Sequence, residues 1–154
     1  KTLKNLDKLI VVAEKDLHRF LVCKGNILFN RTNSKELVGK TAVFRLDYPM
    51  AYAGYLIKAI PNELADPEYI GAFMNTQSTK KYLRNKCKSI VGMANINAKE
   101  FQSIPIAIPP LSLQRRFAAI VEGVERQKAR MRAHGAELDA LFASLQSRAF
   151  NGEL

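Results

Sequence analysis

Apolar residues in the last third of the chain recur at alternating steps of four and three. Eleven positions between Leu113 and Arg148 follow this stepping, and eight of them are apolar. No proline interrupts the stretch, so the pattern predicts one helix from Ser112 to about Phe150 that buries a narrow stripe against another helix. The stripe, called the seam below, comprises Leu113, Phe117, Ile120, Val124, Gln127, Met131, His134, Leu138, Leu141 and Leu145.

This helix is too long for the rest of the chain to cover. Its 39 residues would form a rod of roughly 58 Å at ~1.5 Å per residue. A compact domain of 154 residues has a radius of gyration near ~15 Å. Residues 111–154 are therefore expected to form a unit separate from a domain at 1–110, and to need a helical partner.

Two seam positions are polar, Gln127 and His134, and they bracket the midpoint near residue 130. In an antiparallel pair they would lie near the dyad and could fix the register. The alternative is that both face solvent.

Short apolar stretches alternate with polar loops in the first 60 residues. Strands are predicted at 16–22, 27–31, 40–46 and 51–60.

Helix signals follow. An Asp-Pro-Glu sequence at 66–68 supplies an N-cap, a first-turn proline and an acid, and predicts a helix to about Arg84. Asn97 and Glu100 have the spacing of a capping box and predict a short helix.

Prolines then set the boundaries of the next segments. Pro105 restricts 104–108 to an edge strand or an extended strap, Pro109-Pro110 ends it, and Ser112 is predicted to cap the long helix. The fold class expected is α+β: a small mixed or antiparallel-sheet domain with short helices, followed by one long C-terminal coiled-coil helix.

The charge is concentrated in the first part. The chain has 24 basic and 14 acidic residues, a net charge of +10, and residues 1–110 hold 17 basic and 9 acidic of these. A basic domain favours a polyanionic partner, most often nucleic acid, although the charge could be merely solubilising.

Catalytic signatures are missing. The sequence has no glycine-rich phosphate loop, no zinc-protease motif and no nucleophile elbow, so no catalytic residue, metal site or cofactor is expected. His18 has no nucleophile nearby, and Cys23 and Cys87 match no metal spacing and are expected to be reduced thiols. With no apolar run long enough to span a membrane and no signal peptide, a cytoplasmic binding module is expected.

Two stretches are candidates for nucleic-acid contact. The loop at 30–35 offers an arginine and amides that can pair with base edges, and the basic run at 80–88 can grip phosphates. The alternatives are an ordinary polar hairpin loop and a solvated helix end. The predicted contacts are Arg31, Asn33, Lys35, Lys40, Lys58, Lys80, Lys81, Arg84, Lys86 and Lys88.

A third possibility is a single-stranded nucleic-acid binder, which needs exposed aromatic platforms. Tyr48, Tyr52 and Tyr55 could serve, but packing in a strand explains Tyr52 and Tyr55 more simply.

Two long stretches resemble a known family. One is Gly-Asn-Ile-Leu-Phe-Asn-Arg-Thr-Asn at 25–33, continuing to Phe44; the other runs from Asn95 through Pro-Pro-Leu-Ser-Leu-Gln at 109–114 into a helix ending Phe-Asn-Gly-Glu-Leu at 150–154. Together they resemble the DNA-specificity (S) subunit of type I restriction-modification enzymes.

The resemblance implies a target recognition domain followed by a helical spacer, with no catalysis of its own. In the family two such halves read one half each of a split duplex site, and their spacer helices pack antiparallel. Implied partners are double-stranded DNA, the modification (methyltransferase) subunits, through them the restriction subunit, and a second half or a second copy of this chain. S-adenosylmethionine and ATP are bound by the other subunits.

The chain departs from the family at Asn26, where an aspartate is usual. Any role that the aspartate carboxylate has in the family is therefore not carried over to this chain. Only one half is present, and the first strands of the recognition domain are expected to be missing, either because the chain is a fragment or because it is a truncated half subunit. The alternative function is a coiled-coil protein-interaction adaptor with an incidental basic head.

Overall fold

Strand β2 (Ile27–Asn30) lies at the centre of a three-stranded antiparallel sheet, between β4 (Thr41–Val43) and β6 (Leu56–Ala59). Phe29 is opposite Thr41 on one side and Ile57 on the other. Because side chains alternate along a strand, Ile27 and Phe29 point to the same face, and both are buried there. This computed structural model describes residues 20–34, 36–90 and 93–153, without the side chains of 88–90.

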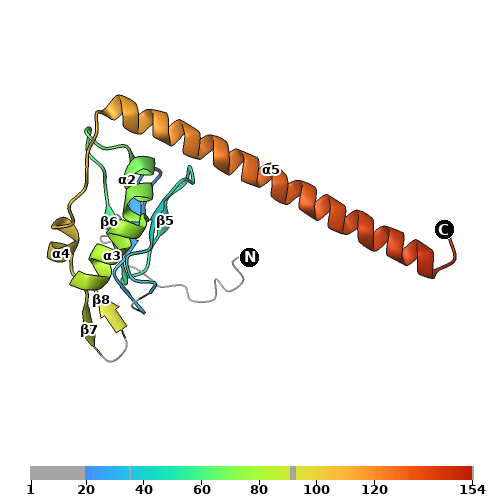
Figure 1. Cartoon of the computed structure of the whole chain (residues 1–154), viewed down its shortest axis with the longest axis horizontal. Coiled ribbons are helices and arrows are strands. Elements are labelled where there is room, and N and C mark those ends of the chain that lie inside the picture. The colour runs from blue at the N-terminus through green and yellow to red at the C-terminus, as the bar shows by residue number, and fades with distance from the viewer. Residues whose placement is uncertain (1–19, 35, 91–92, 154) are drawn as a thin grey trace.

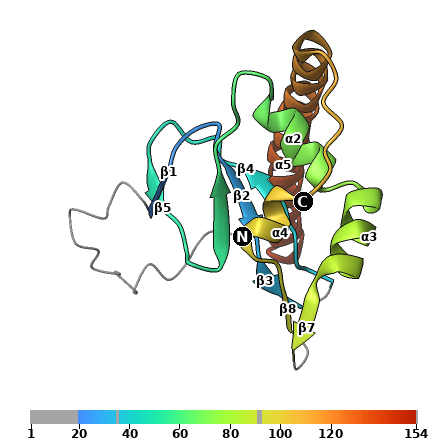
Figure 2. The ribbon, with the colours of Figure 1, turned by 90° about the vertical axis from the view of Figure 1, so that its left-hand side faces the viewer.

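Two smaller sheets flank this one (Figure 2). Strands β1 (Leu21–Val22) and β5 (Met50–Ala51) form a two-stranded ribbon. Strand β8 (Met93–Asn95) pairs with both β3 (Thr32–Asn33) and β7 (Lys88–Ile90).

The single strands predicted at 40–46 and 51–60 are too long. The first is reduced to β4, and the second is two strands, β5 and β6, that belong to different sheets. A turn at Gly54-Tyr55 separates them. Apolar alternation continued through the turn, so the pattern alone did not mark the change of partner.

The helix predicted from Asp66 to about Arg84 is also two helices, α2 (Pro67–Met74) and α3 (Gln77–Lys86). Asp66 caps α2 as expected, accepting hydrogen bonds from the backbone of Glu68 and Tyr69. The break is made by Thr76, whose hydroxyl accepts from the backbone N–H of Thr79 and so starts a new helix.

Two glycines allow the helices to pack closely against the sheet. Gly71 of α2 lies against Val43, where a Cβ would come within 2.7 Å of the valine Cγ2. Gly39, with a φ of 78°, turns the chain into β4 and lies against Leu83 of α3, 2.5 Å from where its Cβ would be. A residue with a side chain at either position would push a helix off the sheet.

The core lies between the sheet and these helices. Its fully buried members are apolar: Ile27, Phe29, Val38, Ile70, Met74, Leu83, Ala94, Ile96 and Ile104. The short helix α4 (Ala98–Gln102) adds Phe101, whose ring is 4.7 Å from that of Phe29. The predicted capping box of Asn97 and Glu100 is present at its start.

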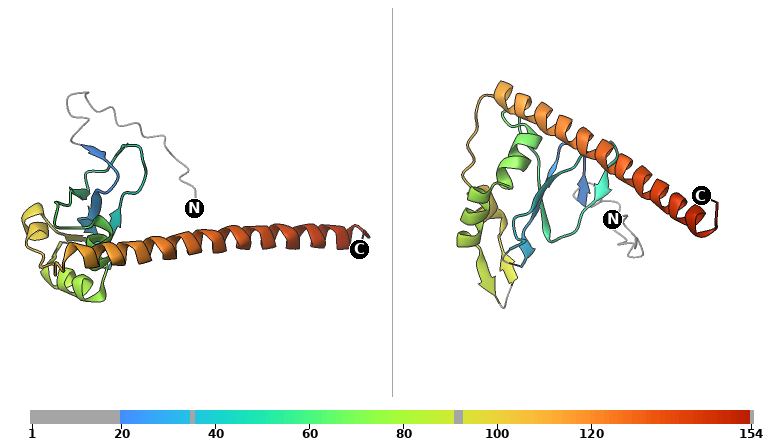
Figure 3. Two further views of the ribbon diagram at one scale, coloured as in Figure 1. Left: turned by 90° about the horizontal axis from the view of Figure 1, so that it is seen from above. Right: turned by 45° about the vertical axis from the view of Figure 1, so that its right-hand side comes forward.

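The described residues before α5 form one domain, called the head below. Helix α5 (Leu111–Phe150), called the rod, leaves the head and runs far beyond it (Figures 1 and 3). Its N-cap is Pro110, and Ser112, the predicted cap, lies inside the first turn with no capping hydrogen bond. From Arg126 onward every described residue of α5 except Gly135 is exposed. The α+β fold class is therefore confirmed, with antiparallel sheets, short helices and one long C-terminal helix.

Candidate nucleic-acid interface

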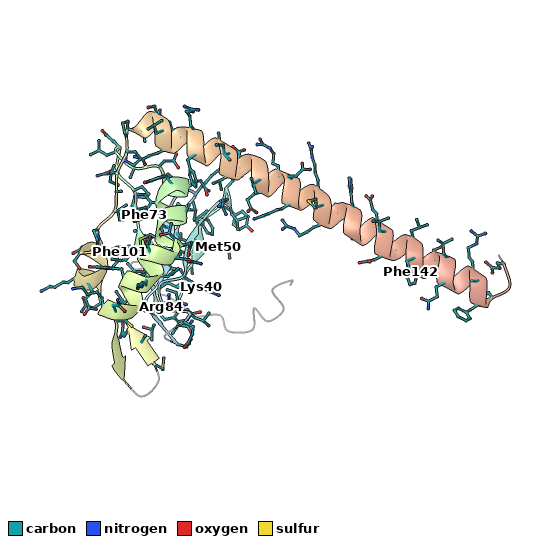
Figure 4. All side chains as sticks on the ribbon, in the orientation of Figure 1. Lys40, Met50, Phe73, Arg84, Phe101 and Phe142 are labelled. Atoms are coloured by element: carbon teal, nitrogen blue, oxygen red, sulfur yellow. The ribbon has the colours of Figure 1, made fainter. Side chains whose placement is uncertain are left out.

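Four of the predicted cations come together on the head, around an open depression of about 720 Å³. Lys80, Lys81 and Arg84 lie on one face of α3, because residues three and four apart share a helix face. Lys40 reaches the same place from the start of β4, and Figure 4 labels Lys40 and Arg84 on this part of the head. The other lining residues are Glu36, Asn75, Gln77 and Ser78.

Lys80 differs from its neighbours because it is half-buried. Its Nζ donates a hydrogen bond to the carbonyl of Gly39, which ties α3 to the turn before β4. The pKa of Lys80 is lowered to about 8, chiefly by burial and to a lesser extent by the positive charge of Lys40. Lys81, Arg84 and Lys40 are exposed, so they are better placed than Lys80 to reach a ligand.

The rest of the basic run does not line this depression. Lys86 lies over the ring of Tyr82, with Nζ 5.9 Å from the centroid. The side chain of Lys88 lies outside the described part of the structure. Among the described side chains of the run from 80 to 88, Lys80, Lys81 and Arg84 therefore converge with Lys40, and Lys86 does not.

The loop residues predicted to face bases are partly engaged within the head. Asn33 lies in β3, and its Oδ1 accepts a hydrogen bond of 2.8 Å from the backbone N–H of Ser34. Arg31 is half-buried, and its Nε is buried with no hydrogen-bond partner among the described residues. Lys35 lies outside the described residues.

Lys58 is held elsewhere. Its Nζ donates to the carbonyl of Leu21 at 2.9 Å and lies 5.8 Å from the centroid of the Tyr52 ring. It therefore links β6 to β1, away from the depression lined by α3.

Asn75 was missed by the sequence reasoning, although it lies between two hollows. It lines the depression beside α3 and a second one of about 450 Å³ over β2, where the buried Oδ1 of Asn30 has no partner among the described residues. The Asn75 amide donates to the carbonyls of Thr41 and Gly71 and so joins α2 to β4. No local sequence signal marks such a long-range bridge.

The seam of α5 is exposed in this chain. Its apolar members have exposed side chains: Leu113, Phe117, Ile120, Val124, Met131, Leu138, Leu141 and Leu145. The face of α5 turned to the head is a different one, with Gln114 fully buried and Ala118 and Val121 half-buried. Phe117 belongs to the seam and also contacts the head, with its ring 6.0 Å from that of Tyr69.

Across 20–34, 36–90 and 93–153 no cluster of His, Cys, Asp and Glu could hold a metal ion, and Cys23 and Cys87 are free thiols. His18 is not among the described residues, and no helix in the described part has the length and apolarity needed to cross a membrane.

A basic head carried on a long helix with an uncovered apolar seam is the arrangement of a binding and spacing protein. The family model of the type I restriction modification DNA specificity domain matches residues 2–138, and the chain belongs to this family.

The curated relatives that match are specificity subunits of type I restriction enzymes, one of them putative. The chain is 29% identical over 149 residues to the type I restriction enzyme EcoKI specificity subunit of Escherichia coli K12, covering 92% of this chain and 32% of that protein. It is 33% identical over 107 residues to the StySPI specificity subunit of Salmonella potsdam, covering 65% and 22%. It is 26% identical over 112 residues to a putative specificity subunit, MjaX, of Methanocaldococcus jannaschii, covering 71% and 26%. The chain thus spans about a third or less of these relatives.

One solved structure has the same fold. It is described as the structural basis underlying complex assembly and conformational transition of the type I R-M system, and it aligns with a TM-score of 0.58 at 24% identity. The alignment covers 87% of this chain and 32% of the other.

Proposed function

We propose that the chain is one half of a type I specificity subunit, whose head recognises a half-site in duplex DNA and whose rod sets the spacing to a second head. The observation that carries the proposal is the convergence of Lys40, Lys81 and Arg84 from two elements around one open depression. The family match and the charge excess of residues 1–110 support it.

Phosphates are the ligands that this depression suits best. Lys40, Lys81 and Arg84 contact the phosphates of the DNA backbone. Lys86 and Lys88, further along the basic run, add contacts of the same kind. Lys80 holds α3 to the turn at Gly39. Phosphate contacts set position and orientation without reading sequence. Lys58 is a weaker candidate, because its ammonium already binds the Leu21 carbonyl.

Base readout is assigned to the loop after β2. Arg31 and Asn33 follow the central strand directly, so the sheet presents them, and Lys35 is included from its place in the sequence. Arg31 is the strongest candidate, because its Nε lacks a partner in the described part of the head. A bidentate contact to a base contributes about 1–3 kcal/mol of discrimination.

The rod supplies the second half of the function. Its exposed seam pairs with a second spacer helix, from the other half of a subunit or from a second copy, in an antiparallel arrangement that holds two heads apart. The modification subunits assemble on this scaffold and bring the restriction subunit, so catalysis lies in those proteins and this chain contributes none. The complex acts on DNA in the cytoplasm.

The test begins with selection of binding sites from a random duplex library at low salt. A single enriched half-site motif is expected. Lys81→Ala with Arg84→Ala should then weaken binding to all sequences alike and flatten the log–log salt dependence by about 1.8, or ~0.9 for each lost phosphate contact.

Lys99→Ala is the matched control, since Lys99 is an exposed cation on α4 outside the depression. An unchanged affinity in the double variant would contradict the role of α3. No enrichment at all, together with tight pairing through the rod, would favour the adaptor.

A further inference from the structure

The joint between head and rod is built around one buried amide. Gln114 in the first turn of α5 has no exposed surface. Its Oε1 accepts a hydrogen bond of 2.8 Å from the backbone N–H of Asp66, and its Nε2 donates to the carbonyls of Leu64 at 2.9 Å and Pro109 at 2.8 Å. Three backbone groups from two segments, 64–66 and the strap before α5, therefore meet at a single side chain.

Each of the two segments leads directly into a helix. Asp66 is the N-cap of α2, so Gln114 connects the first turn of α5 to the point where α2 begins. Pro109 belongs to the strap that leads into α5. The carbonyls of Leu64 and Pro109 lie outside any helix, so the Gln114 amide gives buried backbone groups the partners that no helix supplies.

A second brace lies one turn further along α5. The ring of Phe117 meets that of Tyr69 edge-on at 6.0 Å, and the Tyr69 hydroxyl donates to the carbonyl of Ala107 at 2.8 Å. Gln114 and Phe117 are three residues apart and both contact the start of α2, so they resist rotation of α5 about that point.

Beyond these two residues, head and rod diverge. A hollow of about 550 Å³ opens between them, lined on the head by Arg45 and Glu68 and on α5 by Val121, Glu122 and other residues. From Arg126 the rod has left the head (Figure 3). The angle of a 40-residue helix is thus set over the part before Arg126, about four turns at ~3.6 residues per turn.

A short joint at the end of a long lever amplifies small errors. At ~1.5 Å per residue the rod is roughly 60 Å long, and a tilt of ~10° at its base displaces the far end by about 10 Å. That displacement is about 3 base pairs at ~3.4 Å each.

We propose that Gln114 is a positioning residue, which fixes the angle between head and rod and thereby the separation of two recognition heads. The second part of this inference rests on the proposed function. Gln114 touches no DNA in this assignment and acts through the three backbone groups that it binds.

Two substitutions separate positioning from simple packing. Gln114→Met keeps the length of the side chain and removes all three hydrogen bonds. Gln114→Glu keeps the acceptor but faces two carbonyl oxygens with a carboxylate, which repels them. Tyr69→Phe is a milder variant for the case that either unfolds the head, because it loses only the hydroxyl bond to Ala107.

The angle is measured as a distance between spin labels at Lys99 on the head and Ser144 on the rod, both exposed. Cys23→Ser and Cys87→Ser provide the background, and dilution with unlabelled protein removes distances between copies. The unsubstituted joint should give one narrow distribution. Gln114→Met and Gln114→Glu should broaden it about twofold or more, in line with lost buried hydrogen bonds, and Tyr69→Phe less.

Gln146→Met is the matched control, the same change on the exposed far end of the rod. An unchanged width in folded Gln114 variants would overturn the inference.

The functional readout uses duplexes with two half-sites at varied spacing. The variants should accept a wider range of spacings, while their affinity for a single half-site stays within about twofold because the grip on phosphates is intact. A spacing preference as sharp as the original would overturn the functional part. Failure of the unsubstituted protein to bind any duplex would overturn the proposed function, and the label distances would still decide whether Gln114 fixes the angle.

Discussion

The head and the rod treat their apolar residues in opposite ways. In the head, Phe29 lies at 0% exposure among eight other buried apolar residues. In the rod, Phe142 is 69% exposed and Leu138 65%. Apolar surface is costly to leave in water. The head buries its apolar residues within one chain, whereas the rod leaves its seam exposed, as expected of a surface that binds a partner.

The largest expected effect is on the head. Phe29→Ala should lower the free energy of unfolding by about 3–5 kcal/mol, because it leaves a cavity under the central strand. Phe142→Ala, the same change on the rod, should cost less than about 0.5 kcal/mol in the unpaired chain. Urea denaturation at low protein concentration measures both, and similar losses would contradict the contrast between the two regions.

A charged residue in the seam should weaken pairing of the rod, whereas the same residue outside the seam should not. Leu138→Asp buries a charge in the paired seam and should weaken association at least about tenfold, or ~1.4 kcal/mol. Ala140→Asp adds the same charge to the same helix outside the seam and should have little effect. Sedimentation over a concentration series compares them, and equal weakening by both would assign the contact to another face.

A smaller effect concerns the cation held inside the head. The pKa of Lys80 is lowered from 10.5 to about 8, chiefly by burial. Between these two pH values the unfolded chain binds more protons than the folded one, so this lysine adds stability as pH rises through the window. The stability of the natural chain relative to Lys80→Met should therefore increase from pH 8 to 10.5.

Lys81→Met is the control for this pH dependence, because Lys81 is exposed on the same helix. Its difference from the natural chain should not vary across the same range. A flat difference for Lys80→Met as well would show that the ammonium is not strained by burial.

The smallest effect belongs to the exposed surface of the rod. Arg126 and Glu122 form an (i, i+4) pair with N and O 2.8 Å apart, and both are largely exposed. Glu122→Gln should reduce local helix stability by only about 0.3–0.5 kcal/mol. Amide hydrogen exchange along the rod detects this change, which should vanish in about 1 M salt because the charges are then screened.

Features with a local chemical cause could be predicted from the sequence. The cap at Asp66, the box of Asn97 and Glu100 and the long helix each depend on residues close together in the chain. The break at Thr76 has a local cause too, a threonine hydroxyl that caps α3, and the prediction of one continuous helix overlooked it.

Features with a distant cause could not be predicted. The strand expected at 51–60 divides because its two parts pair with different strands, β1 and β2, both of which lie far from it in the chain. Likewise, Lys80 was grouped with exposed lysines because its partner, the Gly39 carbonyl, is 41 residues away. Gln114 could be read as part of a junction motif, but its three backbone partners appear only in the folded chain.

The turn at Gly39 has a consequence for how such a protein can diversify. Two hydrogen bonds between Asn30 and the residues at 39–40 close the base of the excursion that follows β2. Val38 anchors its end in the core, whereas Glu36 and Leu37 at its tip are exposed. Doubling a flexible loop costs only about 0.6 kcal/mol. Lineages can therefore exchange or lengthen this tip and inherit an unaltered scaffold, which separates the rate at which the surface changes from the rate at which the fold changes.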